Sequence, residues 1–152
     1  MSRLTAIALC TLFCLATAAQ AQTGNPLAGA WRVSEIAETG KPPLTDPQPG
    51  LYVFTQKHYS FMRISSAKPL PDYPSNDKAS DADKVTVFNS LYLQSGSYSI
   101  KNNVLVIDKV MVAKSAFAMA GAGNRFNIAQ SGDTLTLTQL PNGPAIKLVR
   151  VE

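Results

Sequence analysis

The chain has 152 residues, a formal net charge of +4 and a hydrophobic content of 45%. Its Lys and Arg residues are scattered, whereas a nucleic-acid-binding surface needs them clustered on one face. The composition therefore argues against a nucleic-acid partner and predicts one globular domain with an ordinary charged surface.

The first residues have the pattern of a secretory signal peptide. An apolar run, Leu4–Ala16, follows a basic residue, and Ala19-Gln20-Ala21 forms an A-x-A cleavage site. The run is shorter than the roughly 20 apolar residues of a membrane span. We expect a signal peptide over residues 1–21, cleaved after Ala21, and a periplasmic or secreted domain over residues 22–152 without a stable membrane anchor. The alternative is an uncleaved anchor.

Both cysteines, Cys10 and Cys14, lie inside this leader. A lipoprotein is disfavoured, because Leu9 and Phe13 precede them and lipoprotein processing needs a small residue there. Once the leader is removed, the domain has no cysteine. It then contains neither a disulfide framework nor thiol chemistry.

A strand is predicted over Trp31–Ala37. Side chains alternate along a strand, so Trp31, Val33 and Glu35 are expected on one face. Residues 39–50 contain four prolines, which a hydrogen-bonded ladder does not tolerate, so they are predicted to form a long loop.

The next segments, Leu51–Thr55 and Tyr59–Ile64, are rich in aromatic and β-branched residues and are predicted to form a hairpin. Residues 65–80 form a second long loop. A short helix is then expected, because Ser80 suits an N-cap and acidic residues follow it. Its predicted buried stripe is Val85, Phe88, Leu91 and Tyr92.

The C-terminal half is dominated by strand patterns. Residues 115–123 are small and are expected to form a flexible lid beside the barrel mouth. The evenly spaced strands favour a closed antiparallel up-and-down barrel of about eight strands with one short helix, an all-β fold. The predicted strands of this half are Ser97–Lys101, Val104–Lys114, Asn124–Gln130, Thr134–Gln139 and Ala145–Val151.

Alternation along these strands identifies candidate inward-facing side chains. An eight-stranded barrel has an interior that side chains fill or that holds one small ligand, and the sequence leaves both options open. The candidate ligand-lining residues are Val33, Tyr52, Phe54, Phe61, Tyr98, Ile107, Phe126, Ile128, Leu137 and Leu148.

Two charged residues, Glu35 and Arg63, are also candidates for the ligand site. Glu35 is expected to face inward, and a buried carboxylate must be paired or neutral. Arg63, Tyr98 or Arg150 is its candidate partner. The alternative is that the strand twists and leaves Glu35 in water, which is the more common position for an acidic side chain.

The sequence offers little for catalysis or metal binding. His58 is the one histidine and falls in a predicted turn, without neighbouring metal-ligand types. Asp81 and Asp83 are explained by the helix dipole. The Gly121-Ala122-Gly123 stretch lacks the basic and hydroxyl residues of a phosphate-binding loop. We therefore expect no metal, no cofactor and no catalytic residue.

Five segments occur in the order of the predicted strands: residues 27–33, 50–55, 95–100, 125–128 and 132–137. Taken together, they resemble the bacterial lipocalin-like domain family, within the wider calycin group of ligand-binding barrels. The resemblance implies a barrel that binds a small hydrophobic molecule. It also implies that Gly29 and Trp31 close one end, with a late basic residue over the indole, either Arg150 or Arg125.

The leading hypothesis is an exported barrel that binds or carries a small hydrophobic or amphipathic molecule. An alternative is a cofactor-free enzyme of the cyclase or isomerase type. It requires Glu35, Tyr59, Arg63 or Tyr98 to converge inside the pocket with a perturbed pKa. A third hypothesis is a protein-interaction module with a filled barrel and an exposed apolar patch. The oligomeric state is left open.

Overall fold

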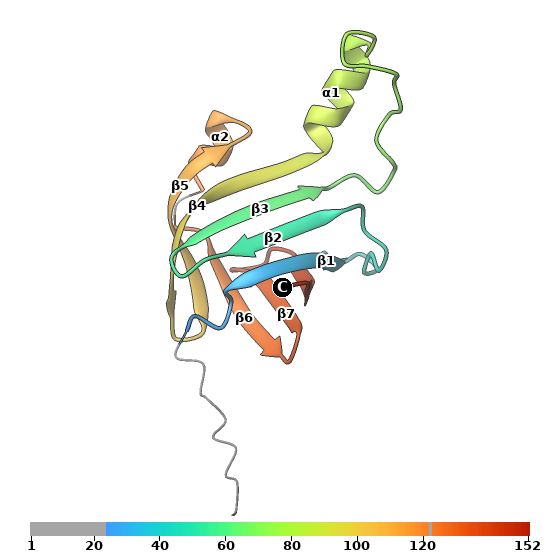
Figure 1. Cartoon of the computed structure of the whole chain (residues 1–152). Helices are drawn as coiled ribbons and strands as arrows, with labels where there is room; N and C mark the ends of the chain where they lie inside the picture. Colours follow the sequence, from blue (N-terminus) through green and yellow to red (C-terminus); the bar gives the residue numbers. More distant parts are fainter. Residues whose placement is uncertain (1–23, 122) are drawn as a thin grey trace, which may run out of the picture.

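The computed structural model describes residues 24–121 and 123–152 (Figure 1). The predicted signal peptide, residues 1–21, lies outside the described residues. The elements in chain order are β1 (Gly29–Ala37), β2 (Gly50–Phe54), β3 (His58–Ile64), α1 (Asp81–Ser90), β4 (Leu91–Lys101), β5 (Val104–Ala113), α2 (Ala116–Met119), β6 (Arg125–Ser131), β7 (Thr134–Gln139) and β8 (Ala145–Arg150).

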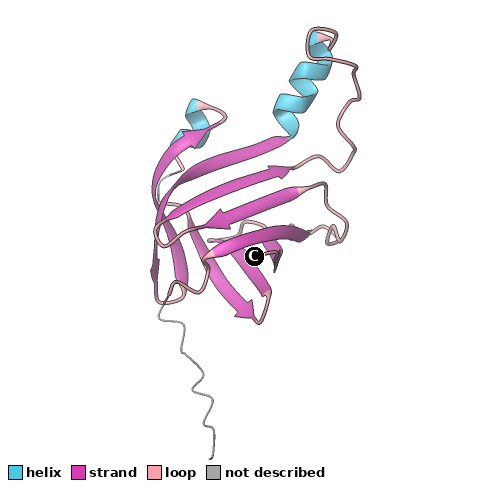
Figure 2. Ribbon diagram, in the orientation of Figure 1, coloured by secondary structure: helices cyan, strands magenta, loops and turns pink. Residues whose placement is uncertain are grey.

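The strands form one closed barrel in which each pairs with the next along the chain and β8 returns to pair with β1. All of these pairings are antiparallel, so the strands run alternately up and down, and Figure 2 shows them wrapping around a common interior. The seam between the first and last strands runs from Trp31, opposite Arg150, to Ala37, opposite Ala145. The predicted closed up-and-down barrel is confirmed.

The two ends of the barrel differ in their connections. At one end, short hairpin turns join β2 to β3, β4 to β5 and β6 to β7. The turn between β4 and β5 uses Asn102 and Asn103 with φ angles of 50° and 61°, which asparagine tolerates better than most residues. At the other end, the long segments 38–49, 65–80 and 114–121 emerge. We call the end with the short turns the closed end and the end with the long segments the open end.

The predicted helix begins where the sequence indicates, but its apolar side chains are not buried as predicted. Ser80 caps α1, and Asp83 completes a reciprocal capping box. The expected buried stripe does not form: Val85 is 58% exposed and Phe88 50% exposed. In Figure 1, α1 projects from the open end, away from the barrel interior. Local capping therefore determines where this helix begins, while no neighbouring layer covers its apolar side chains.

The other two residues of that stripe, Leu91 and Tyr92, belong to β4, which begins earlier than the sequence predicts. Gly96 lies inside this strand beside two register shifts against β5. A Cβ atom at Gly96 would lie 1.9 Å from the carbonyl oxygen of Lys109. Only glycine allows the two backbones to approach this closely, so the glycine belongs to the ladder and does not precede it.

The register of β1 differs from simple alternation. A β-bulge lies between Val33 and Glu35, so the residues beyond it exchange faces. Ile36 is consequently buried in the barrel, whereas Glu35 faces outward and lies 3.7 Å from Lys147. The expectation of an inward Glu35 is therefore wrong, and the expected alternative, a wet carboxylate, describes its position.

The segment expected to be a flexible lid contains the short helix α2. Ser115 caps it by accepting a hydrogen bond from the backbone N–H of Ala118 at 3.2 Å. Below α2, β5 and β6 pair over only three residues, from Val104 to Val106 on β5. Helix α2 therefore lies where the part of β5 beyond Val106 lacks a β6 partner.

Candidate functional site

Aromatic side chains fill the barrel between its centre and its closed end. Phe61 is 1% exposed. Its ring centre lies 4.3 Å from that of Tyr52, 4.4 Å from that of Tyr59 and 6.3 Å from that of Phe126. Such dense packing leaves little room for a ligand at this level. The predicted lining residues that the structure buries here are Val33, Tyr52, Phe54, Phe61, Tyr98, Ile107, Phe126, Ile128, Leu137 and Leu148.

A tryptophan and an arginine pack against each other and fill the closed end. The guanidinium carbon of Arg150 lies 4.0 Å from the centre of the Trp31 ring, in cation–π geometry. Arg150 also donates hydrogen bonds to the carbonyls of Ala28 at 2.8 Å and Pro26 at 3.2 Å. Gly29 is needed beside this pair, since a Cβ there would lie 2.6 Å from Arg150 Nη1. The competing candidate, Arg125, lies at the opposite end, at the start of β6.

This arrangement predicts the effect of removing the guanidinium. Arg150→Met keeps the apolar stem but loses the cation–π contact, three hydrogen bonds to backbone oxygens and the exposed ion pair with Asp133, so we expect the free energy of unfolding to fall by about 2 kcal/mol. Urea unfolding monitored by circular dichroism measures this. The control is Lys147→Met on the outer face of the same strand, with an expected change within about 0.5 kcal/mol. Equal losses in both variants would contradict a role for Arg150 at the closed end.

The open end contains two cavities. The first, the loop cavity, has a volume of about 340 Å³ and is lined by Ile36, Leu44 and Arg63 together with residues of the loops. The second, the helix cavity, has a volume of about 490 Å³ and lies beside α2, where Tyr92 and Gln94 line it. Both volumes lie in the range of about 300–1,000 Å³ that is typical of small-molecule sites.

Arg63 and Tyr92 connect these cavities. They lie opposite each other on β3 and β4. The guanidinium carbon of Arg63 lies 4.9 Å from the centre of the Tyr92 ring. Since Arg63 lines the loop cavity and Tyr92 lines the helix cavity, the two cavities adjoin across this pair.

Three buried polar atoms near the open half of the barrel have no hydrogen-bond partner among the described residues. They are Nε of Arg63, Oη of Tyr59 and Oε1 of Gln94. A buried polar atom without a partner costs about 1–3 kcal/mol, so most native proteins satisfy such atoms. Two of these atoms belong to residues that line a cavity, Arg63 in the loop cavity and Gln94 in the helix cavity, where a ligand could supply the missing partner.

The tyrosines around Arg63 are held in their neutral form. Burial raises the pKa of the Tyr52 hydroxyl to about 12, and the positive charge of Arg63 opposes that rise. Burial also raises the pKa of Tyr92, again opposed by Arg63. For Tyr59, burial raises the pKa and nearby Tyr92 raises it further. At neutral pH, these three side chains therefore present protonated hydroxyls, which are able to donate hydrogen bonds.

The structure brings only two of the four candidate residues of the enzyme hypothesis to the interior side of the same strand. Glu35 faces the outside of the barrel. Tyr98 lies toward the closed end, where its hydroxyl donates a hydrogen bond to the carbonyl of Thr55 at 2.8 Å. Tyr59 and Arg63 share β3 and remain on the interior side. These four groups do not form one pocket.

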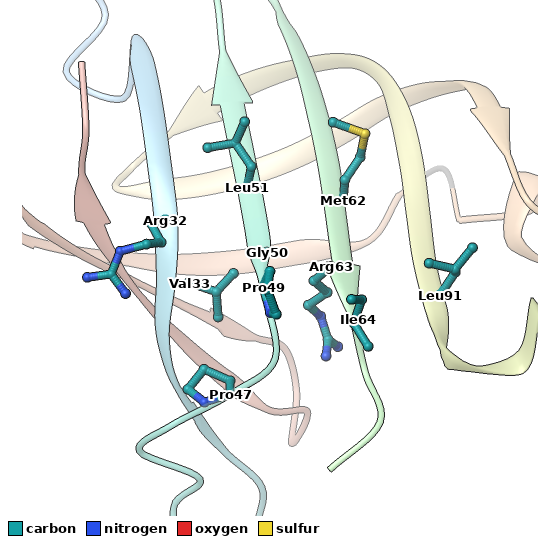
Figure 3. A pocket seen from close by; sticks show the side chains of 10 residues that line it. All are labelled: Arg32, Val33, Pro47, Pro49, Gly50, Leu51, Met62, Arg63, Ile64 and Leu91. Atoms are coloured by element: carbon teal, nitrogen blue, oxygen red, sulfur yellow. The ribbon is translucent and has the colours of Figure 1, made fainter. Parts of the chain in front are cut away.

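A third hollow, the outer groove, has a volume of about 520 Å³ and lies on the outside of the barrel (Figure 3). It forms where β1 and β2 diverge beyond the pair of Arg32 and Leu51. Leu51 and Met62 contribute exposed apolar side chains. Arg63 borders both the outer groove and the loop cavity.

Other types of site are absent from the described part of the chain. Residues 24–121 and 123–152 contain no group of three His, Cys, Asp or Glu side chains arranged to hold a metal ion. His58 is exposed at the start of β3. In the same residues, neither helix has the length and apolar character of a membrane-spanning segment.

Sequence reasoning identified Arg63 but missed Tyr92 and Gln94. The sequence predicts Tyr92 in the buried stripe of a helix, and Gln94 lies just before the predicted strand, whereas both belong to β4. A usable signal was present: Tyr92, Gln94, Gly96 and Tyr98 recur at every second position, as on one face of a strand. The helical spacing that begins at Val85 concealed this pattern.

Comparison with known proteins identifies related sequences and folds. The family described as a lipocalin-like domain matches residues 28–148. A lipocalin-like protein from Bacteroides uniformis ATCC 8492 is 14% identical, with a TM-score of 0.49, over 82% of this chain and 97% of that chain. An uncharacterized protein from Bacteroides eggerthii DSM 20697 is 10% identical, with a TM-score of 0.49, over 82% of this chain and 98% of that chain. No curated protein matches the sequence.

Proposed function

Because the chain belongs to the lipocalin-like domain family, we propose that it binds a small amphipathic molecule at the open end of its barrel. The observation that carries this proposal is the pair of adjoining cavities at that end, bordered by Arg63 and Tyr92. The filled half of the barrel supports the same location, because its aromatic rings occupy the space that a deeper ligand needs.

Binding in this proposal is driven by burial of apolar ligand surface. About 25 cal/mol is gained for each Å² of apolar surface removed from water. Ile36 and Leu44 supply apolar contacts in the loop cavity. Tyr92 and Ala118 supply them in the helix cavity. The few polar groups between them then fix the orientation of the ligand, as in most small-molecule sites.

We further propose that the domain acts outside the cytoplasm, after cleavage of the leader over residues 1–21. The support is the sequence pattern of the leader and its A-x-A site. A fusion of this leader to a reporter enzyme that is active only after export tests the proposal. We expect reporter activity and a mature N-terminus at Gln22; an inactive, uncleaved fusion would contradict it.

A neutral fluorescent probe, N-phenyl-1-naphthylamine, tests binding at the open end independently of ligand charge. We expect its emission to rise in a saturable manner with the native protein. Ala118→Phe places a ring in the helix cavity, so we expect probe affinity to fall at least about tenfold, on the order of the contribution of a few buried apolar groups.

The matched control is Ala116→Phe, which introduces the same ring on the exposed side of α2, outside the residues that line the helix cavity. We expect it to leave probe affinity unchanged. If both variants bind the probe like the native protein, the helix cavity is not the site. If the native protein gives no saturable signal, the proposed binding function is wrong.

A further inference from the structure

We propose that the molecule bound at the open end is an acid, and that Arg63 recognises its carboxylate. This inference rests on the proposed function and specifies the chemical class of its ligand. Arg63 occupies an inward position of β3 and forms part of the wall of the loop cavity. Its Nε atom is buried and has no hydrogen-bond partner among the described residues. Figure 3 shows its side chain extending along β3 toward the open end.

Arg63 lacks an ion-pair partner in the described part of the chain, although the Glu38 carboxylate is near enough for the charge of Arg63 to help lower its pKa. None of the ion pairs among the described residues includes Arg63. Glu38 is the one acidic side chain that lines the loop cavity, and its carboxylate contacts the ammonium group of Lys41 at 2.5 Å. The loop cavity therefore has two cations and one anion, and the anion is paired with Lys41. An arginine remains charged at all physiological pH values, so the loop cavity carries a net positive charge that an anionic ligand would neutralise.

The helix cavity adds to this positive balance. Lys114 is its one charged lining residue among those described. Its ammonium group donates to the backbone carbonyl of Phe88 at 3.0 Å, and no carboxylate pairs with it. Across both cavities, cations therefore outnumber carboxylates. A neutral or cationic ligand leaves this imbalance, whereas an anionic ligand removes it.

A carboxylate also matches the hydrogen-bond donors beside the guanidinium. Its two oxygens accept up to about four hydrogen bonds, and the planar fork of arginine fits them in pairs. The hydroxyls of Tyr52 and Tyr92 lie close enough to Arg63 for its charge to act on both. These neutral hydroxyls offer further donors to an oxygen held by Arg63. The Tyr92 ring, in contact with the cation, provides an apolar surface for the carbon chain next to the carboxylate.

Decanoate and 1-decanol test this inference, because they share a chain length and differ in the head group. Isothermal titration calorimetry of the native protein at pH 7 should give at least tenfold tighter binding for decanoate, as expected for a hydrogen-bonded charge pair. Arg63→Gln should remove that preference and leave the affinity for 1-decanol within about twofold. Arg63→Lys keeps the charge but loses the fork, so an intermediate preference is expected.

The control is Arg32→Gln, which removes an exposed arginine on the outer face of β1 beside the outer groove. It should retain the full preference for decanoate. If Arg32→Gln abolishes the preference, the acid binds on the outer face and the assignment to Arg63 is wrong. Emission from Trp31 at the closed end, with thermal unfolding, confirms that each variant is folded.

The outcomes separate this inference from the function on which it rests. Equal affinity of the native protein for decanoate and 1-decanol overturns the acid inference even if Arg63→Gln fails to fold, and it leaves the binding function intact. Binding of neither compound, together with no signal from N-phenyl-1-naphthylamine, overturns the binding function itself. A decanoate preference that survives in folded Arg63→Gln assigns the recognition to another residue and also overturns the inference.

Discussion

Replacing Trp31 by alanine should lower the free energy of unfolding by about 3–5 kcal/mol, the range for deleting a large buried ring. The indole is fully buried. Its Nε1 donates a hydrogen bond to the carbonyl of Leu27 at 2.8 Å, and Arg150 covers one face. The substitution therefore leaves a cavity, an unsatisfied carbonyl and a cation without its aromatic partner.

Urea unfolding followed by far-ultraviolet circular dichroism measures this loss, because Trp31 is the one tryptophan of the chain and its fluorescence disappears with it. Trp31→Phe is the informative intermediate: it keeps most of the apolar volume and loses the hydrogen bond, so we expect a loss of about 1–2 kcal/mol. The exposed Met62→Ala serves as the control, with a change within about 0.5 kcal/mol. A loss below about 1 kcal/mol for Trp31→Ala would show that the closed end contributes little to stability.

Adding one methyl group at Gly96 should have an effect of similar size. In Gly96→Ala, the new Cβ would lie 1.9 Å from the carbonyl oxygen of Lys109 and 3.1 Å from the Cα of Val110. Both are backbone atoms and cannot rotate away, so β4 and β5 must separate locally. We expect a loss of roughly 3 kcal/mol in the free energy of unfolding, the upper part of the range for overpacking.

The same methyl group added at Gly24 is the control, because there the nearest atom, Nε2 of Gln56, is 3.6 Å away in ordinary contact. Gly24→Ala should change the free energy of unfolding by less than about 0.5 kcal/mol. Amide hydrogen exchange adds a local measurement: in Gly96→Ala, protection should fall first in the residues of β5 that face Gly96. A Gly96→Ala protein as stable as the Gly24→Ala protein would contradict the close approach of the two strands.

Sequence patterns were sufficient for the overall fold because the barrel is built from local hairpins. Alternating apolar residues, turn residues such as Asn102 and Asn103, and even spacing each indicate antiparallel neighbours. The wrong predictions concern residues whose orientation depends on pairing with a distant part of the chain. The bulge after Val33 reverses the faces of Glu35 and Ile36, and a bulge depends on pairing with β8 at the far end of the sequence. Simple alternation contains no information about that partner.

The candidate site was predicted in part, for a related reason. Inward-facing residues follow from alternation, but whether they fill the barrel depends on how side chains pack in three dimensions. Phe61 and the tyrosines beside it are inward as expected, and they occupy the interior. Arg63 is a sequence candidate as a partner for an inward Glu35, and the structure retains Arg63 beside a cavity without that partner. Tyr92 was assigned to a helix because its spacing from Phe88 fits a helical period as well as a strand.

The seam between β1 and β8 has a consequence for how the chain is made. On a ribosome, β1 is the first of the described strands to emerge, and its partner across the seam is the last. Until β8 arrives, the growing sheet has two unpaired edges, which are able to pair with other chains. Such long-range pairing also slows folding, because the chain loses the entropy of loop closure before the stabilising contacts between the two strands form. Nascent or C-terminally shortened forms of this protein should therefore be its most aggregation-prone species.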